Sequence, residues 1–408
     1  MDRNKAISFM HDLLRMMVSK DGSDLFITTG SPPAMKIDGK VATVSKQNLS
    51  PNHTQMLARS IMNDKQVSEF EEKQECNFSI ALPGVARFRV NAFIQRGSSG
   101  MVLRIINSEI PTFDELNLPP ILQDIAMTKR GLVIFVGGTG SGKSTSLASM
   151  VDYRNRNTHG HIITIEDPVE FVHDHQNCLV TQREVGVDTE SYEIALKNTL
   201  RQAPDVILIG EVRDREAMEH AIAFAETGHL CLTTLHANST NQALDRIINF
   251  FPDERRQQLL MDLSLNLKGL VSQRLIPKID GAGRIPAIEV MLNTPLMADL
   301  IFKGDVHEMK SLIAKSNEAG MKTFDQALFD LYEEQKITFE DALRNADSVN
   351  DIRLRIKLES NTARKTGVVE DHRDFELEES DDDVAGGMIL PGEVIWPVNP
   401  PRSCWNPT

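Results

Sequence analysis

The 408-residue sequence has little cysteine, and its four cysteines lie far apart: Cys76, Cys178, Cys231 and Cys404. No two form a C-x-x-C pair, so we expect neither a disulfide framework nor a zinc module, which fits a reducing compartment. Long uncharged apolar runs are also missing, and none reaches the roughly 18 residues that span a bilayer. Residues 1–20 lack the apolar core of a signal peptide. We therefore expect a cytoplasmic protein without a transmembrane segment.

Positive charge is in short supply as well. Lysine and arginine number 44 against 58 aspartates and glutamates, so the formal net charge is −14. More than half of this excess lies between Thr366 and Gly392, which holds nine acids and one arginine. A protein that binds duplex nucleic acid needs a basic surface, so the composition argues against a nucleic-acid partner.

The chain divides into four stretches. Residues 1–109 begin with an amphipathic helical pattern and continue with short strands separated by turn residues, which predicts a small α+β domain. Residues 110–120 carry three prolines and are typical of a linker. Residues 121–358 are interpreted as the second domain. In residues 359–408 the apolar periodicity fails and acids dominate, so we predict a disordered acidic tail.

The second domain alternates apolar strands with helical stretches. We predict strands at 132–136, 162–165, 206–209 and 230–234, and mainly helices from 252 to 358. This alternation predicts an α/β fold whose mostly parallel sheet is covered on both faces.

One segment of this domain carries the strongest motif. The stretch Gly137-Gly138-Thr139-Gly140-Ser141-Gly142-Lys143-Ser144 matches the P-loop pattern G-x-x-x-x-G-K-[ST]. Its glycines let backbone N–H groups surround phosphate oxygens, Lys143 adds a positive charge, and Ser144 offers a hydroxyl to Mg²⁺. A strand precedes it, and a helix starting near Thr145 follows, which argues against a chance glycine-rich turn. The motif predicts ATP and Mg²⁺ as cofactors.

Acidic residues follow two further strands. Glu166 and Glu170 come after 162–165, where a nucleotide site needs a base or a metal ligand; a solvated acidic loop is the alternative. Glu211 ends the strand 206–209 as a Walker B acid would, placed to hold Mg²⁺ through water, although it could simply cap a buried strand. His236 ends the fourth strand and is either a sensor of the γ-phosphate or a packing residue.

Four arginines lie on or beside the strands of the first domain. They are Arg87, Arg89, Arg96 and Arg104, and none has an acid at i±2. They form either a solvated strand face or a set of phosphate contacts, since a planar guanidinium matches phosphate oxygens.

These stretches together resemble the secretion ATPase superfamily, in particular its PilT/PilU branch. The resemblance covers about residues 1–358 and is carried by 86–91, the P-loop, 163–172, 201–205, 209–214, 225–229 and 233–236. It implies a PAS-like N-terminal domain, a RecA-like ATPase domain, and a homo-hexameric ring.

The resemblance also assigns roles by position. Glu170 matches the proposed general base, with Glu166 as a neighbouring acid, and which of the two is the base stays open. Glu211 matches the Walker B acid, and His229 and His236 fall in the His-box region. Nucleotide-binding residues would be those from Gly137 to Thr145, together with Arg89 and Arg104, which in this family reach across the ring.

One stretch departs from the retraction motors. PilT-type chains carry Ala-Ile-Arg-Asn-Leu-Ile-Arg-Glu late in the sequence, and the equivalent residues 296–304 here have lost both arginines. This loss and the acidic tail resemble the PilU side of the branch, whose members are accessory to PilT. The implied partners are a PilT-like paralogue ring and an inner-membrane pilus platform protein, so we expect a cytoplasmic protein held peripherally at the pilus base. Residues 391–408 do not resemble the family.

Three other functions fit the sequence less well. A pilus assembly or type II secretion ATPase would carry a larger N-terminal region and a tetracysteine zinc module. A nucleic-acid translocase would carry an aromatic and basic strand face. A non-catalytic ATP-binding scaffold would not need an intact set of Lys143, Glu170 and Glu211.

Overall fold

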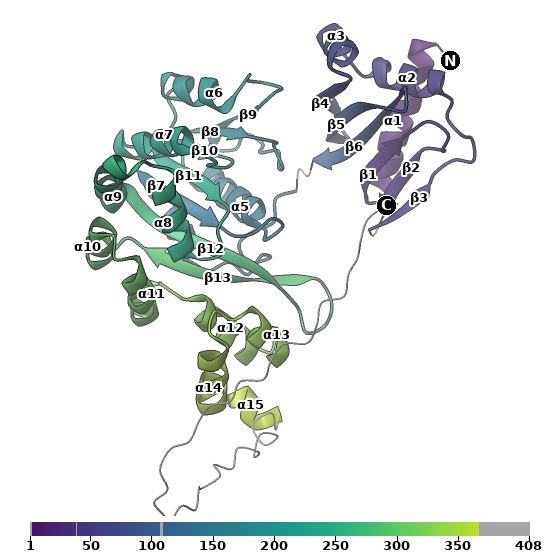
Figure 1. Cartoon of the computed structure of the whole chain (residues 1–408). Coiled ribbons are helices and arrows are strands. Elements are labelled where there is room, and N and C mark those ends of the chain that lie inside the picture. Colours follow the sequence, from purple (N-terminus) through teal and green to yellow (C-terminus); the bar gives the residue numbers. More distant parts are fainter. Residues whose placement is uncertain (1, 38, 107–108, 367–408) are drawn as a thin grey trace, which may run out of the picture. The chain divides into compact units, whose positions relative to one another are not determined.

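The computed structural model describes residues 2–37, 39–106 and 109–366. The first of its two sheets is antiparallel and has the order β3-β2-β1-β6-β5-β4. It lies among the purple and blue elements of Figure 1. Its strands are β1 (Gly22–Ile27), β2 (Ala34–Ile37), β3 (Lys40–Thr43), β4 (Glu75–Leu82), β5 (Ala86–Gln95) and β6 (Ser98–Ile106). Its helices are α1 (Arg3–Ser19), α2 (Pro51–Ser60) and α3 (Asp64–Lys73).

The apolar core of this sheet lies on one of its faces. Along β5, Phe88 and Val90 are fully buried, whereas Arg87 and Arg89, which alternate with them, are half-exposed. Successive strand residues point to opposite faces, so the buried ones join Met10 of α1 in one core. Along β5 the other face carries the polar side chains of Arg87, Arg89 and Asn91, and the sequence leaves open whether the arginines form a solvated face or phosphate contacts.

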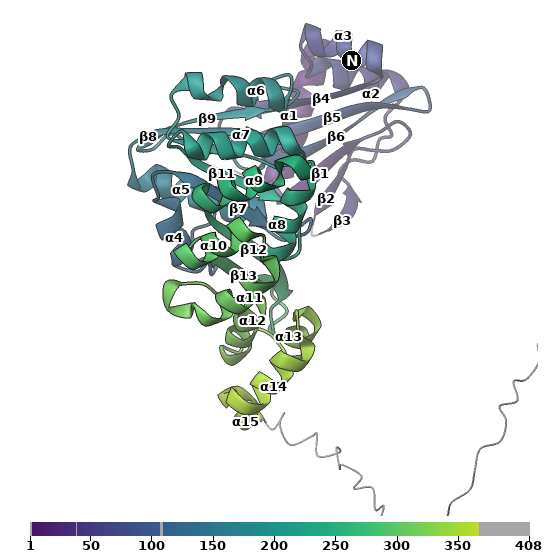
Figure 2. The same cartoon turned by 60° about the vertical axis from the view of Figure 1, so that its left-hand side comes forward.

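The second sheet has seven strands in the order β13-β12-β7-β11-β10-β8-β9, and all neighbours are parallel except β12 and β13. The sheet runs through the teal and green part of Figure 2. Its strands are β7 (Gly131–Val136), β8 (Gly160–Glu166), β9 (Cys178–Glu184), β10 (Val206–Ile209), β11 (Leu230–Leu235), β12 (Leu267–Pro277) and β13 (Arg284–Leu292).

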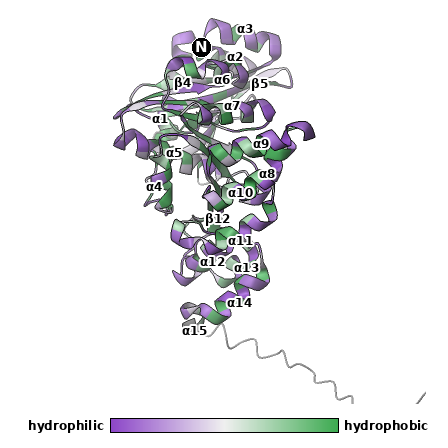
Figure 3. Ribbon diagram, turned by 90° about the vertical axis from the view of Figure 1, so that its left-hand side faces the viewer, coloured by the Kyte–Doolittle hydropathy of each residue, from purple (hydrophilic) through white to green (hydrophobic). Residues whose placement is uncertain are grey.

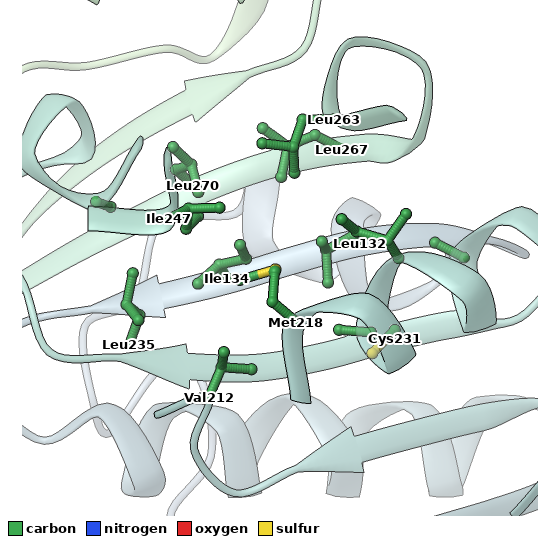
Figure 4. Packing of buried hydrophobic residues seen from close by; sticks show 14 of the residues in the cluster. Leu132, Ile134, Val212, Met218, Cys231, Leu235, Ile247, Leu263, Leu267 and Leu270 are labelled. Atoms are coloured by element: carbon green, nitrogen blue, oxygen red, sulfur yellow. The ribbon is translucent and has the colours of Figure 1, made fainter. Parts of the chain in front are cut away.

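Helices cover both faces of this sheet, as predicted. On β7, Leu132 and Ile134 join a core formed with helices α6 to α11, whereas Val133 and Phe135 join a second core formed with α4 and α5. Figure 4 shows Leu132 and Ile134 packed among Met218, Leu263 and Leu270. The helices are α4 (Ile121–Ala126), α5 (Lys143–Asn157), α6 (Tyr192–Thr199), α7 (Arg215–Glu226), α8 (Thr240–Asn249), α9 (Asp253–Asn266), α10 (Pro295–Lys303) and α11 (Val306–Lys315).

Two predicted stretches differ from the structure. The prediction of mainly helices from residue 252 onward is wrong for 267–292, which form the hairpin of β12 and β13. Its apolar residues come in runs that suit a buried strand and a helix equally well. The 110–120 stretch is no bare spacer, because Phe113 and Leu118 are buried against α4 and α5.

The chain continues with α12 (Phe324–Glu333), α13 (Phe339–Asn345), α14 (Val349–Glu359) and α15 (Asn361–Thr366). The first eight residues of the predicted tail are therefore largely helical, and the rest of it lies outside the described residues. Hydrophilic and hydrophobic residues alternate along the helices in Figure 3. Of the helices in the described part of the chain, none combines the length and apolar character that crossing a bilayer requires.

Candidate active site

The P-loop joins the carboxyl end of β7 to the start of α5. Gly137, Gly140 and Gly142 have φ values of 154°, 74° and 85°, a region that side chains with a Cβ disfavour. Within the part of the chain that the structure describes, no side chain caps the first turn of α5, so its N–H groups are available to an anion. The motif thus forms a glycine-rich turn between a strand and a helix, the local structure that the sequence predicts.

Lys143 closes over this loop. Its Nζ donates to the carbonyl oxygens of Gly137 at 2.8 Å and Gly138 at 3.0 Å, and the side chain is buried. Burial lowers the pKa of Lys143, and the nearby carboxylates of Glu211 and Glu170 partly oppose that effect. An ammonium group desolvated in this way gains strongly from a phosphate partner.

A cavity of about 220 Å³ opens beside the loop, at the carboxyl ends of β7, β8, β10 and β11. Ligands bind at this edge in open α/β sheets. Its lining comprises Thr139, Gly140, Lys143, Ser144, Leu147, Ala148, Thr164, Glu166, Asp167, Pro168, Glu170, Phe171, His173, Tyr192, Leu208, Gly210, Glu211, Thr234 and His236. The structure therefore gathers the P-loop, the predicted acids and His236 around one space.

The two candidate bases differ in environment. Glu166 accepts a hydrogen bond from Thr164 Oγ1 at 2.6 Å and one from Gln182 Nε2 at 3.4 Å. Burial raises the pKa of Glu166 to about 7, although these hydrogen bonds work against the rise. Glu170 lies four residues on, after a cis Asp167–Pro168 bond, and is exposed at the cavity lip.

Glu211 is held by two basic side chains. Arg213 Nε donates to its Oε2 at 2.8 Å, and His236 Nε2 lies 3.1 Å from its Oε1. Arg213 also reaches Asp167 at 3.3 Å, and the hydrogen bond to Glu211 raises the pKa of Arg213. These contacts fix the carboxylate against the end of β10.

The donors on this cavity suit Mg²⁺, a hard cation that prefers oxygen. The Ser144 hydroxyl and the Glu211 carboxylate line it together. Among the described residues, no group of three His, Cys, Asp or Glu side chains is placed to hold a metal ion. An ion here would therefore depend on nucleotide phosphates and water for its remaining ligands.

Three predicted residues lie elsewhere. His229 precedes β11, at the amino edge of the sheet, where its backbone carbonyl accepts from the Gly131 N–H and its Nδ1 lies 3.1 Å from Thr227 Oγ1. Arg89 and Arg104 are directly opposite each other on β5 and β6 of the first sheet. None of the three lines the cavity of its own chain.

Some residues of the site carry no sequence motif. Gln182 of β9 donates to the Phe171 carbonyl oxygen at 2.8 Å and accepts from the His173 N–H at 2.8 Å, which secures the segment carrying Glu170. Gln273 of β12 reaches the P-loop itself. A second cavity of about 380 Å³ flanks the start of α5 and is lined by Thr145 and Gln273, among others. Isolated glutamines give no pattern, so only the fold reveals them.

Comparisons with known proteins identify relatives that this chain covers almost completely. The family model described as Type II/IV secretion system protein matches residues 1–299. The type IV pilus ATPase PilU of Pseudomonas aeruginosa is 61% identical over 376 residues, which cover 92% of this chain and 98% of that protein. The retraction ATPase PilT of the same organism is 43% identical over 335 residues, 82% of this chain and 97% of PilT. A crystal structure of the pilus retraction motor PilT with bound ADP superposes with a TM-score of 0.79 at 40% identity, covering 85% of this chain and 99% of that one.

Proposed function

This chain belongs to the type II/IV secretion system protein family and is an ATPase of that family, and from this premise we propose that it is a motor subunit that assists type IV pilus retraction. The observation that carries the proposal is the identity of 61% with PilU over nearly all of that protein. The likeness to PilT also establishes the predicted α/β class with a RecA-like ATPase domain.

We assign the chemical steps to the residues around the cavity. Lys143 and the backbone N–H groups of the P-loop bind the phosphates, and Glu170 orients and deprotonates the attacking water. Glu166 is the alternative base, because its pKa of about 7 suits proton exchange near neutrality. Ser144 and Glu211 would hold Mg²⁺, which offsets phosphate charge when bound. His236, next to Glu211, is placed to respond to the γ-phosphate.

The acting unit would be a ring of six subunits. Arg89 and Arg104 do not line the cavity of their own chain, so a neighbour would present them across a subunit interface, as arginine fingers do. His229 does not line the cavity of its own chain either, so a catalytic role for it would also be played at a subunit interface. In this proposal the ring sits at the cytoplasmic side of the inner membrane, at the pilus base.

Mixing two inactive variants tests the ring. Arg104→Ala removes the contribution made to a neighbour, and Lys143→Ala removes the subunit's own site, so mixed rings contain some complete sites and should regain ATPase activity. The control is a mixture of Lys143→Ala with Lys143→Ala/Arg104→Ala, which forms no complete site and should stay inactive. A monomer with full activity would contradict the proposal.

The accessory role requires a test in cells. In a strain that lacks its PilT-type motor but overexpresses this chain, pili should rarely retract when imaged directly, because residues 296–304 lack the two arginines of the PilT motif. Restoring the PilT-type motor provides the control. Retraction at normal frequency without it would show that this chain is an independent motor.

A further inference from the structure

Gln273 lies in the middle of β12, on the face of the sheet that α5 covers. Its neighbour Val271, two residues earlier, belongs to the core beneath α5, and side chains alternate along a strand. The Gln273 side chain is 2% exposed, and both ends of its amide are bonded. Nε2 donates to the Ser141 carbonyl oxygen at 2.9 Å, and Oε1 accepts from Ser146 Oγ at 2.8 Å. One side chain thus links the P-loop to the first turn of α5.

The P-loop closes tightly around this residue. A Cβ added to Gly137 would lie 2.6 Å from the Gln273 carbonyl oxygen and 2.4 Å from Ser141 Oγ, and one added to Gly142 would lie 2.8 Å from Gln273 Nε2. Real Cβ atoms essentially never approach so closely. Two of the motif's glycines are therefore required partly because Gln273 occupies the adjacent space.

The hydrogen bond to Ser141 has a consequence for the next peptide group. A trans peptide is planar, and its C=O and N–H point in opposite directions. Because the Ser141 carbonyl is turned toward Gln273, the N–H of Gly142 is turned away from that side chain. The next residue, Lys143, donates from its Nζ to the Gly137 and Gly138 carbonyl oxygens of the same loop.

We propose that Gln273 is a positioning residue for nucleotide binding, which holds the Ser141–Gly142 peptide so that its N–H faces the phosphates. Gln273 acts through this peptide and need not touch the nucleotide. Without it the carbonyl can turn inward, where it would repel phosphate oxygens and withdraw a donor. The proposal rests on nucleotide binding by the P-loop and adds a residue from outside the motif.

The test measures ADP affinity of the full chain by calorimetry between pH 6 and pH 8.5. Gln273→Met keeps the volume but loses the donor, so ADP should bind about ten- to a hundredfold more weakly. In turnover assays KM should rise more than kcat falls, because the lost contact serves bound and reacting nucleotide alike. Ser149→Ala is the matched control, since that buried α5 hydroxyl has no hydrogen-bond partner among the described residues and its removal should leave ADP binding unchanged.

Gln273→Glu separates positioning from packing. Its protonated carboxyl can donate to the Ser141 oxygen, whereas the ionised form repels it, and burial raises the pKa of such a group. Relative to wild type, its ADP affinity should therefore rise as the pH falls, with no such trend in Gln273→Met. The proposal is overturned if Gln273→Met binds ADP as wild type does, or if the affinity of Gln273→Glu follows wild type at every pH. Failure of the wild-type chain itself to bind ADP would instead overturn the proposed function.

Discussion

The two sheets of this chain present polar side chains in different ways. The antiparallel sheet packs its apolar core on one face, and arginines lie on the other face in the middle of its strands, as Arg89 does in β5. The parallel sheet is covered on both faces, and every residue of β7, β10 and β11 is buried. The polar groups that line the nucleotide cavity there lie mostly at the carboxyl ends of strands and in the loops that follow.

This difference separates two kinds of functional surface. In the antiparallel sheet, pairing sets a row of side chains across β4, β5, β6 and β1, namely Ser79, Arg89, Arg104 and Asp24. In the parallel sheet, strand ends converge on a single cavity. Substitutions at the ends of the parallel strands should therefore reduce the rate of ATP hydrolysis by orders of magnitude. Substitutions on the arginine-bearing face of the antiparallel sheet should change the free energy of unfolding by only about 1–2 kcal/mol or less.

Lys143→Ala should give the largest effect. The variant removes the positive charge from a site otherwise built of neutral backbone donors, so turnover should fall by several orders of magnitude while the fold survives. ATPase assays on the purified, folded variant measure this. Lys65→Ala, an exposed lysine of the first domain, is the control and should keep full activity. Near-normal turnover in Lys143→Ala would remove the P-loop from the mechanism.

Glu170→Gln should give the second-largest loss of ATP hydrolysis. If Glu170 is the base, the variant should bind ATP normally but hydrolyse it about 10²–10⁴-fold more slowly in single-turnover assays. Glu166→Gln should then retain more activity. The reverse order of the two variants would assign the base to the buried Glu166.

Glu166 should also make stability depend on pH. Its pKa rises from 4.5 to about 7 on folding, so the folded state holds this proton more tightly than the unfolded state does. Stability from this group is therefore complete below pH 4.5 and declines as the pH rises to about 7, by about 3 kcal/mol. In urea unfolding without nucleotide, the free energy of unfolding of Glu166→Gln should increase relative to that of wild type between pH 5 and pH 8. The exposed Glu190→Gln is the control and should show no such increase. If the unfolding free energies of wild type and Glu166→Gln change with pH in parallel, Glu166 does not link stability to pH.

The smallest effect is on stability and concerns the arginine pair of the antiparallel sheet, apart from any loss of ATPase activity in the ring. Arg104 Nε donates to buried Asp24 at 2.7 Å, so Arg104→Ala leaves that carboxylate without its charged partner and should cost about 1–2 kcal/mol. Arg89→Ala should change the unfolding free energy by less than about 0.5 kcal/mol, as surface changes usually do. Adding Asp24→Asn should recover part of the Arg104→Ala loss. Equal losses at the two arginines would mean that the Asp24 contact contributes no stability.

The sequence predicts much of the ATPase domain and of the residues around its cavity. The P-loop, the acids after β8 and β10, and His236 all lie where parallel strands predict them, because strand ends converge whatever the details of packing. The β12–β13 hairpin was missed because its apolar runs fit a helix as well as a strand. Gln273 was missed with it, since its role depends on the strand that brings it beneath the P-loop. The position of His229 at the opposite edge follows from which end of β11 it adjoins.

The outermost strand β13 is paired at one point by a segment that follows it in the chain. Val290 exchanges two backbone hydrogen bonds with Lys322, at 2.8 and 3.1 Å, so the segment before α12 is joined to the sheet by main-chain atoms. An open strand edge invites pairing with another molecule, and a lysine at that edge discourages it. A chain truncated before Met321 would expose the β13 edge and should aggregate. Because these two bonds join main-chain atoms, the side chain at position 322 can change while the pairing with β13 is kept.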